Sequence, residues 1–284
     1  MLRLLTKSPL NRFYPFQSKK EYTNAASMPQ CIDAAYAFPP HNLSIDIPFS
    51  KCYNMVNLYE KRIRMSRTEI ISRIESEQLI AIVRGIKREH LIPMAEAMYA
   101  GGVRVLEITY SANGAVSDEE TAEGIRALKS HFGDRMAIGA GTVLTERQVD
   151  LTAEAGGEFI ISPDVNVDVI KKTVSQGLVS IPGALTPTEA QTAHRAGADF
   201  VKLFPITSLG VPYVKAIRAP LSHIRFLAVG GVDEHNMKDY LAAGVCGFGI
   251  SSSIVNKQMI ESGDFDGVTA LARTFIRALQ EARK

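Results

Sequence analysis

The chain of 284 residues has no tryptophan and only three cysteines, and none of its 21 glycines precedes Gly85. Cys31, Cys52 and Cys246 form no CxxC pair, so they offer neither a disulfide framework nor the spacing of a metal site. We therefore expect a reducing, cytoplasmic location. No apolar run approaches the roughly 20 residues that a membrane helix needs, so we expect no membrane partner.

A strong charge of one sign is also missing. The formal net charge is +2, which is too small to favour nucleic acid as a partner. A composition of 46% hydrophobic and 22% charged residues is typical of a globular chain and excludes a disordered or collagen-like one. Residues 1–64 hold nine Lys and Arg against four Asp and Glu, whereas residues 65–284 hold 23 against 26. The larger part of the chain is therefore mildly acidic.

Residues 1–64 read as an irregular N-terminal leader. They hold six of the 13 prolines and show neither sustained helical periodicity nor strand alternation. The first 20 residues carry five basic and no acidic side chains, which is the charge bias of an organelle transit peptide. Alternatively, translation starts at Met65. The segment MSRTEIISRIES, which begins there, predicts the opening helix of a domain, with Ser66 as its N-cap and Glu69 three residues later. We expect a disordered or absent leader and a single domain over residues 65–284.

Eight short apolar or β-branched runs recur in the rest of the chain, each followed by a stretch of helical pattern. They begin at residues 79, 103, 137, 159, 179, 200, 225 and 247. This spacing accommodates a strand, a helix and two short loops. Parallel strands with crossover helices follow, and eight such units predict an α/β fold of the closed (β/α)8 TIM-barrel type. An open doubly wound sheet is the alternative, disfavoured because no GxGxxG follows the first strand.

Polar side chains end the inward-facing sets of several predicted strands. Alternate residues of a strand share a face. The predicted inward sets are Ile80, Ile82 and Arg84; Val103, Val105, Glu107 and Thr109; Ile138, Ala140 and Thr142; and Phe200, Lys202 and Phe204. Barrel enzymes place their active sites at the carboxyl ends of the strands, so we expect the site there.

Lys202 is the strongest candidate for a catalytic residue. It lies in FVKLFP among apolar neighbours, where burial disfavours the ammonium form and lowers the lysine pKa. A neutral amine can attack a ketone, and the resulting Schiff base is an electron sink for cleavage of a carbon–carbon bond. Glu107 lies in the equally apolar VLEITY, where desolvation raises a carboxyl pKa and suits it to proton transfer. The alternative is a structural ion pair between the two residues.

Two further groups of residues predict anion binding. Arg84 can hold a carboxylate bidentately, and Thr142 can donate a hydrogen bond to the same anion. Gly230 and Gly231 end the seventh predicted strand, and Ser252 follows the eighth. The loops after strands seven and eight often bind phosphate in barrels. A plain tight turn is the alternative explanation of the glycine pair.

Together these motifs resemble those of a bacterial enzyme family. The segments VLEITY, IGAGTVL, FIISP, IPG, FVKLFP and the glycine pair occur in unbroken order within residues 67–281. They are similar to the 2-keto-3-deoxy-6-phosphogluconate (KDPG), 2-dehydro-3-deoxy-6-phosphogalactonate (KDPGal) and 4-hydroxy-2-oxoglutarate (KHG) aldolases. The resemblance implies a class I aldolase of carbohydrate metabolism that forms a homotrimer and needs no cofactor or metal.

The resemblance also implies a reaction and a role for each site residue. A 2-keto-3-deoxy-6-phospho sugar acid would be cleaved to pyruvate and glyceraldehyde 3-phosphate, as in the Entner–Doudoroff route, and 4-hydroxy-2-oxoglutarate to pyruvate and glyoxylate. Lys202 would form the Schiff base, and Glu107 would be the general acid and base. Thr142 would help to bind the pyruvate carboxylate. The remaining expected contacts are Pro163 and Phe204 as pocket lining, and Gly230, Gly231 and Ser252 around the phosphate.

Three positions depart from the pattern of the gluconate enzymes. Ser111 stands where many of them carry an arginine that grips the carboxylate, so we expect Arg84 to supply that charge. Val229 replaces a threonine before the glycine pair, as in galactonate-type relatives, which leaves the C4 epimer of the substrate open. Ser251 replaces a common glycine and is expected to narrow the anion site.

A competing hypothesis is a phosphate-binding barrel transferase similar to the thiamine phosphate synthases. Those enzymes use Mg²⁺ and a pyrophosphate, and their acidic metal ligands are not evident in this sequence. The six histidines form no HxH or HExxH pattern either, so we expect no metal site. A non-catalytic binding protein is a third hypothesis, disfavoured because burying several charged groups without a function is costly.

Overall fold

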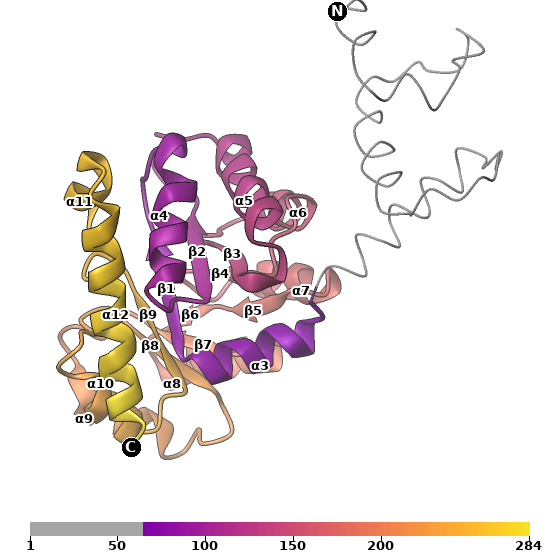
Figure 1. The fold of residues 1–284 in the computed structure, drawn as a ribbon. Helices are drawn as coiled ribbons and strands as arrows, with labels where there is room; N and C mark the ends of the chain where they lie inside the picture. The colour runs from indigo at the N-terminus through magenta and orange to yellow at the C-terminus, as the bar shows by residue number, and fades with distance from the viewer. Residues whose placement is uncertain (1–64) are drawn as a thin grey trace, which may run out of the picture. The chain divides into compact units, whose positions relative to one another are not determined.

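The computed structural model describes residues 65–284, so the predictions made for the leader lie outside it. In this part of the chain nine parallel strands alternate with helices (Figure 1). The strands are β1 (Leu79–Val83), β2 (Val105–Thr109), β3 (Ala137–Gly141), β4 (Phe159–Ile161), β5 (Val179–Ile181), β6 (Gly183–Ala184), β7 (Val201–Leu203), β8 (Phe226–Val229) and β9 (Gly247–Ile250). The helices are α3 (Arg67–Glu77), α4 (Arg88–Ala100), α5 (Asp118–Phe132), α6 (Glu146–Glu154), α7 (Val167–Ser175), α8 (Pro187–Arg195), α9 (Gly210–Arg218), α10 (Met237–Ala242), α11 (Lys257–Ser262) and α12 (Phe265–Ala282).

The strands close into a barrel at Pro182. Their order is β5-β4-β3-β2-β1-β9-β8-β7-β6, and the two strands at its ends, β5 and β6, are separated in sequence by this one residue. Proline has no N–H to donate to a sheet, but its carbonyl accepts a hydrogen bond from the Lys202 N–H at 2.9 Å. The predicted TIM barrel is therefore confirmed, with the fifth predicted strand divided into two short ones.

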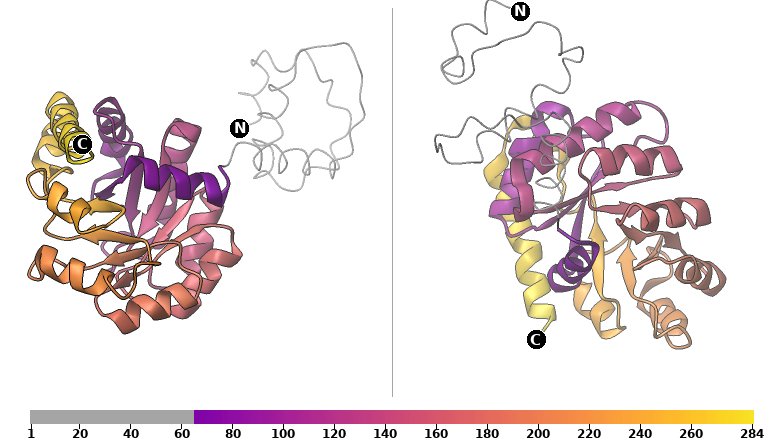
Figure 2. Two further views of the ribbon diagram at one scale, coloured as in Figure 1. Left: turned by 90° about the horizontal axis from the view of Figure 1, so that it is seen from below. Right: turned by 90° about the vertical axis from the view of Figure 1, so that its right-hand side faces the viewer.

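Helix α3 covers the end of the barrel at which the strands begin. Ile70 and Ile74 of this helix are each 1% exposed and pack with inward side chains at the start of the strands, such as Phe159, the first residue of β4, and Phe200, which directly precedes β7. Seen from below, α3 crosses the ring of strands (Figure 2). Its N-terminus carries the predicted capping box, in which Ser66 accepts from the Glu69 N–H and the Glu69 carboxylate accepts from the Ser66 N–H. Apolar packing therefore fills this half of the barrel interior.

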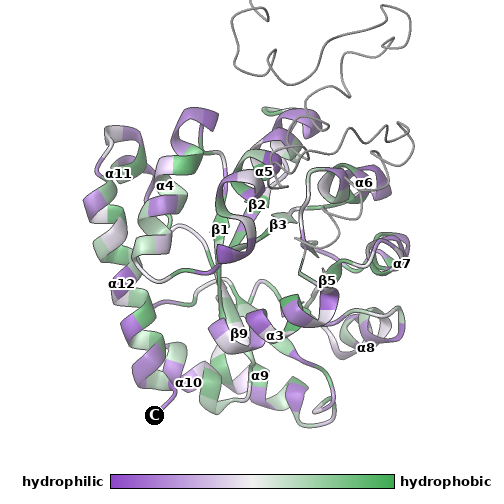
Figure 3. Ribbon diagram, turned by 45° about the vertical axis from the view of Figure 1, so that its right-hand side comes forward, coloured by the Kyte–Doolittle hydropathy of each residue, from purple (hydrophilic) through white to green (hydrophobic). Residues whose placement is uncertain are grey.

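The other helices surround the strands. A second and larger apolar cluster joins their inner faces to the outward side chains of the strands, and the helices' polar residues face away from the barrel (Figure 3). The C-terminal helix α12 lies beside α4, and Gly101 permits this close approach because a Cβ there would overlap Ala272. None of the helices in residues 65–284 is both long and apolar enough to cross a membrane.

Candidate active site

Glu107 and Lys202 both project into the carboxyl half of the barrel, from β2 and β7. Their side chains share the inward faces of Val105 and Phe200, which belong to the cluster beneath them. Glu107 is 1% exposed and Lys202 is 7% exposed. The Nζ atom of Lys202 lies 4.7 Å from the centre of the Phe204 ring, whose electron-rich face favours a cation. The two predicted catalytic residues therefore face one interior.

Burial shifts the pKa values of these two groups in opposite directions. Desolvation raises the pKa of Glu107, against the opposing effects of the positive charges of Lys202 and Arg84. Desolvation also lowers the pKa of Lys202, reinforced by Arg84 and opposed by the Glu107 carboxylate. Both directions agree with those inferred from the sequence. They move both pKa values towards neutral pH, which favours the neutral amine of Lys202 and the protonated carboxyl group of Glu107.

The two groups are not locked into a structural ion pair. The salt bridges found within residues 65–284 include neither Lys202 nor Glu107. The Oε2 atom of Glu107 is buried and has no hydrogen-bond partner in this part of the chain. A buried carboxylate oxygen without a partner is costly, and such groups are found where a ligand or water completes the site.

The inward face of β3 is not the one expected from the sequence. Ile138 and Ala140 belong to the outer apolar cluster, and the residues that face inward are Ala137, Gly139 and Gly141. A Cβ on Gly141 would overlap the Glu107 carboxylate. The predicted inward set of Ile138, Ala140 and Thr142 is therefore wrong by one residue, because side chains of the neighbouring strands occupy the space that larger residues of β3 would need.

Thr142 lies at the site although it does not belong to the inward face of β3. It lies just beyond the end of β3 with φ +55°, a left-handed conformation that is costly for a β-branched residue. In this conformation its Oγ1 accepts a hydrogen bond of 3.1 Å from Arg84 Nη2. Arg84 follows β1, and its guanidinium is exposed at the carboxyl end of the barrel. The structure therefore brings together the two groups predicted to bind one carboxylate.

Gly230 and Gly231 follow β8 on the other side of the barrel mouth. Both have positive φ, +91° and +74°, which glycine adopts without strain. A Cβ on Gly231 would lie 2.9 Å from the Thr207 Cα, and one on Gly230 would lie 3.7 Å from the Phe204 ring. The glycine pair therefore lies against the loop that follows Lys202. Thr207 was not singled out in the sequence, since only this loop contact connects it to the site.

The remaining predicted residues lie at the same end of the barrel. Ser252 is exposed beyond β9, whose neighbour β8 precedes the glycine pair. Half-buried Pro163 follows β4, and its carbonyl lies close to Gly183. A Cβ on Gly183 would overlap this carbonyl, so only glycine lets the two backbones come so near. Ser111, in contrast, donates to Asn113 at 2.7 Å within its own loop, so its hydroxyl already has a partner.

This arrangement defines a class of protein. A TIM barrel with a buried amine, a buried carboxyl group and two polar loop regions at its carboxyl end has the organisation of a barrel lyase of the aldolase kind. The family model for KDPG and KHG aldolases matches residues 70–271. The chain belongs to this family.

Individual relatives agree with the family. The chain is 35% identical over 206 residues to the 2-dehydro-3-deoxy-6-phosphogalactonate aldolase of Escherichia coli K12, covering 72% of this chain and 95% of the relative. It is also 35% identical over 210 residues to the KHG/KDPG aldolase of the same strain, covering 73% and 94%. Among solved structures it resembles the KDPG aldolase of Legionella pneumophila with pyruvate captured as a covalent carbinolamine, at 28% identity, a TM-score of 0.64 and coverage of 71% and 95%.

Proposed function

We propose that the chain is a class I aldolase that cleaves KDPG or KDPGal to pyruvate and glyceraldehyde 3-phosphate, and 4-hydroxy-2-oxoglutarate to pyruvate and glyoxylate. The observation that carries this proposal is the pair of Lys202 and Glu107, buried in one interior with pKa values shifted in opposite directions. The covalent pyruvate adduct of the Legionella relative supports it, because it is an intermediate of the same chemistry.

In the proposed mechanism the neutral Lys202 amine attacks the C2 ketone to form a carbinolamine. Glu107 donates a proton to the departing hydroxyl, and water leaves as the iminium forms. The Glu107 carboxylate then takes the proton of the C4 hydroxyl, the C3–C4 bond breaks, and its electron pair moves into the iminium to give an enamine. After the aldehyde leaves, protonation at C3 and addition of water release pyruvate and restore the amine.

The two ends of the substrate would be held by the two polar loop regions. Arg84 and Thr142, already joined at 3.1 Å, would bind the carboxylate next to the ketone. The phosphate would lie at the backbone amides of Gly230 and Gly231, where the absence of side chains lets an anion approach. Ser252 would add a hydroxyl to this contact, while Pro163 and Phe204 would line the space between the two ends.

Reductive trapping tests the proposal. Incubation with pyruvate and sodium cyanoborohydride is expected to add one reduced pyruvate adduct to Lys202, detected by peptide mass spectrometry. Lys202→Met should remove both the adduct and turnover. Lys215→Met, an exposed lysine of α9, serves as the control and should leave both unchanged. Failure of the wild-type chain to form the adduct would overturn the proposal.

The epimer preference can be tested at Val229. Its side chain faces the barrel interior, because it shares the face of β8 with Leu227 of the inner cluster, and a Cβ on neighbouring Gly249 would lie 2.9 Å from Val229 Cγ2. A threonine here would present a hydroxyl towards a sugar hydroxyl of the substrate. We expect Val229→Thr to change the ratio of kcat/KM for KDPG to that for KDPGal by about tenfold in favour of KDPG. An unchanged ratio would show that this position does not select the epimer.

The homotrimer and the absence of a cofactor remain proposals from the family resemblance. Light scattering coupled to gel filtration tests the trimer. The competing Mg²⁺-dependent transferase requires a set of acidic ligands, and residues 65–284 hold no cluster of three His, Cys, Asp or Glu side chains placed to bind a metal ion. Aldol cleavage that persists in EDTA would favour the aldolase, whereas activity restored only by Mg²⁺ would favour the transferase.

A further inference from the structure

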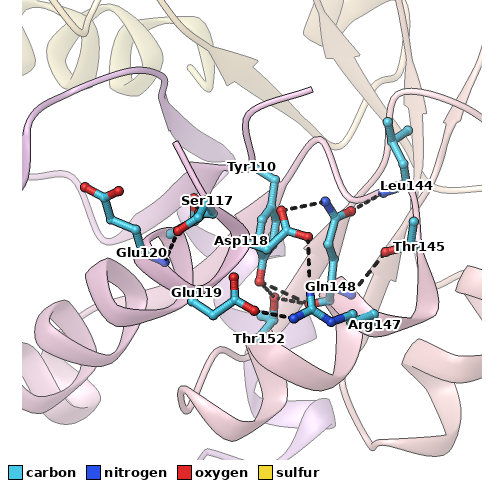
Figure 4. Close-up of polar contacts among 11 residues, drawn as sticks. Tyr110, Ser117, Asp118, Glu119, Glu120, Leu144, Thr145, Arg147, Gln148 and Thr152 are labelled. Carbon is cyan, nitrogen blue, oxygen red and sulfur yellow. Dashed lines mark hydrogen bonds and ion pairs between the residues drawn. The ribbon is translucent and has the colours of Figure 1, made fainter. Parts of the chain in front are cut away.

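The amide of Gln148, in α6, connects the segments that follow β2 and β3 (Figure 4). Its Nε2 donates to Asp118 Oδ1 at 3.0 Å, and its Oε1 accepts from the Leu144 N–H at 2.8 Å. Asp118 begins α5, the helix that follows the strand of Glu107. Leu144 lies two residues beyond Thr142. One side chain that is only 9% exposed therefore joins the two strands' loops just outside the barrel.

The backbone of Gln148 is fixed by further hydrogen bonds, so its amide has a defined direction. Its N–H donates to Thr145 Oγ1 at 3.3 Å. Its carbonyl accepts from the hydroxyls of Tyr110, at 3.2 Å, and Thr152, at 2.7 Å. Tyr110 is 1% exposed and lies three residues beyond Glu107. The tyrosine and threonine hydroxyls therefore hold the backbone of Gln148, while the amide is the part that reaches the loop.

The loop that Gln148 holds contains the strained residue of the site. A left-handed threonine persists only where surrounding contacts maintain it. Downstream of Thr142, the Val143 N–H donates to the Ile161 carbonyl at 3.2 Å, and the next N–H, that of Leu144, donates to Gln148. The hydrogen bond from the Leu144 N–H to the Gln148 amide is therefore a side-chain contact that fixes the turn in which Thr142 meets Arg84.

We propose that Gln148 is a positioning residue for carboxylate binding, which keeps the Thr142 hydroxyl in the place where it and Arg84 hold the substrate's carboxylate. This inference rests on the proposed function of Thr142 and Arg84. Within residues 65–284 the hydrogen bonds of the Gln148 amide go to Asp118 and Leu144 and not to Lys202 or Glu107, so its loss should weaken binding of the carboxylate and leave the chemical step intact.

Gln148→Met tests this role, because methionine has a similar volume but neither donates to Asp118 nor accepts strongly from Leu144. The probe is pyruvate, and the measurement is the pyruvate concentration that gives half-maximal cyanoborohydride trapping on Lys202. We expect this concentration to rise about tenfold, which is the change in affinity expected from the loss of about one hydrogen bond. The trapping rate at saturating pyruvate should stay close to that of the wild type.

Tyr110→Phe is the matched control. It removes the hydroxyl that contacts the Gln148 carbonyl and Thr152, but the Thr152 hydroxyl still donates to that carbonyl and both contacts of the Gln148 amide stay in place. We expect Tyr110→Phe and Gln148→Met both to lower the melting temperature, but only Gln148→Met to raise the half-saturating pyruvate concentration. An equal rise in both variants would show that general loosening, and not the amide contact, is responsible.

A double substitution separates positioning from a purely structural effect. In a Thr142→Ala background there is no hydroxyl left to position, so adding Gln148→Met should raise the half-saturating concentration no further. Effects that multiply in the double variant would overturn the inference. If Gln148→Met fails to fold, Asp118→Ala replaces it, since it removes the partner that orients the amide at a half-exposed position. Absence of trapping in the wild type would instead reject the proposed function.

Discussion

Gly141 contributes to the site by having no side chain. Its place on the inward face of β3 is occupied by the carboxylate of Glu107 from the neighbouring strand. This contact explains why a small residue is needed beside a buried acid.

Gly141→Ala should therefore displace Glu107 and lower kcat/KM by about a hundredfold, the size of effect typical of a misplaced acid–base group. Gly139→Ala is the control, because its Cβ would overlap the Phe159 ring lower in the barrel. Steady-state kinetics and thermal unfolding should show both variants destabilised, but only Gly141→Ala losing most of its activity at temperatures where it is folded. Equal losses of activity would contradict this account.

The pH dependence of trapping is a second test at the scale of residues. The Glu107 carboxylate raises the pKa of Lys202, against the lowering by burial. Glu107→Gln removes that attraction, so the pKa of Lys202 should fall further and the amine should become reactive at lower pH. The midpoint of the trapping rate plotted against pH is expected to move down, while Tyr110→Phe leaves it unchanged. A midpoint that moves up would refute the coupling between the two groups.

The residues of the site differ in how far the sequence could predict their places. Lys202 and Glu107 interrupt apolar strands, and a charged residue among apolar ones indicates both its burial and its face. The phase of β3 could not be obtained in this way, because both of its faces are apolar or small. Which face of β3 turns inward depends on Phe159 and Glu107, whose side chains fill the interior beside it. These are contacts between strands, and the periodicity of a single strand cannot predict them.

At the scale of elements, the eight strand positions followed from recurrence of apolar runs, and the structure confirms them. The division of the fifth strand follows from Pro182, which cannot donate to a sheet and was visible in the sequence. The position of α3 across the end of the barrel was not predicted. Its capping box showed where the helix begins, but the side on which a helix packs is decided by the ring of strands it covers.

Ile74→Ala tests the contribution of α3. The side chain is 1% exposed against the inner cluster, so its truncation should cost about 3 kcal/mol of unfolding free energy, measured by urea denaturation. The site lies towards the other end of the barrel, so KM should not change at temperatures where the variant is folded. Ser72→Ala, on the exposed side of the same helix, should leave both quantities unchanged. A raised KM for Ile74→Ala would show that the two ends are coupled.

At the scale of the whole molecule, the site residues, the family match and the described barrel all lie beyond residue 64. We therefore expect a chain that starts at Met65 to have the same kcat and KM as the chain of 284 residues. Mass spectrometry of the N-terminus of the native protein distinguishes a cleaved transit peptide from a start at Met65. A loss of activity on removal of residues 1–64 would show that the leader takes part in catalysis or assembly.

The charge of the molecule also has to be considered part by part. Residues 65–284 carry more acidic than basic side chains, yet the proposed substrates are anions. Binding would then depend on local positive charge, and the groups that we propose for it are Arg84, Lys202 and the backbone amides of Gly230 and Gly231. The small net charge of the whole chain indicated none of this, because the leader's basic residues offset the acidic barrel.

Apolar packing between α3 and the strands fills the end of the barrel opposite the site, so substrate and products would pass through the carboxyl end, where Lys202 would hold one product covalently. On the proposed mechanism, pyruvate stays bonded to Lys202 after the carbon–carbon bond breaks, while the aldehyde is free to diffuse out. The aldehyde must therefore depart first and pyruvate second. Pyruvate should then compete directly with the sugar acid for the unliganded enzyme, whereas glyceraldehyde 3-phosphate should inhibit noncompetitively by recombining with the enamine.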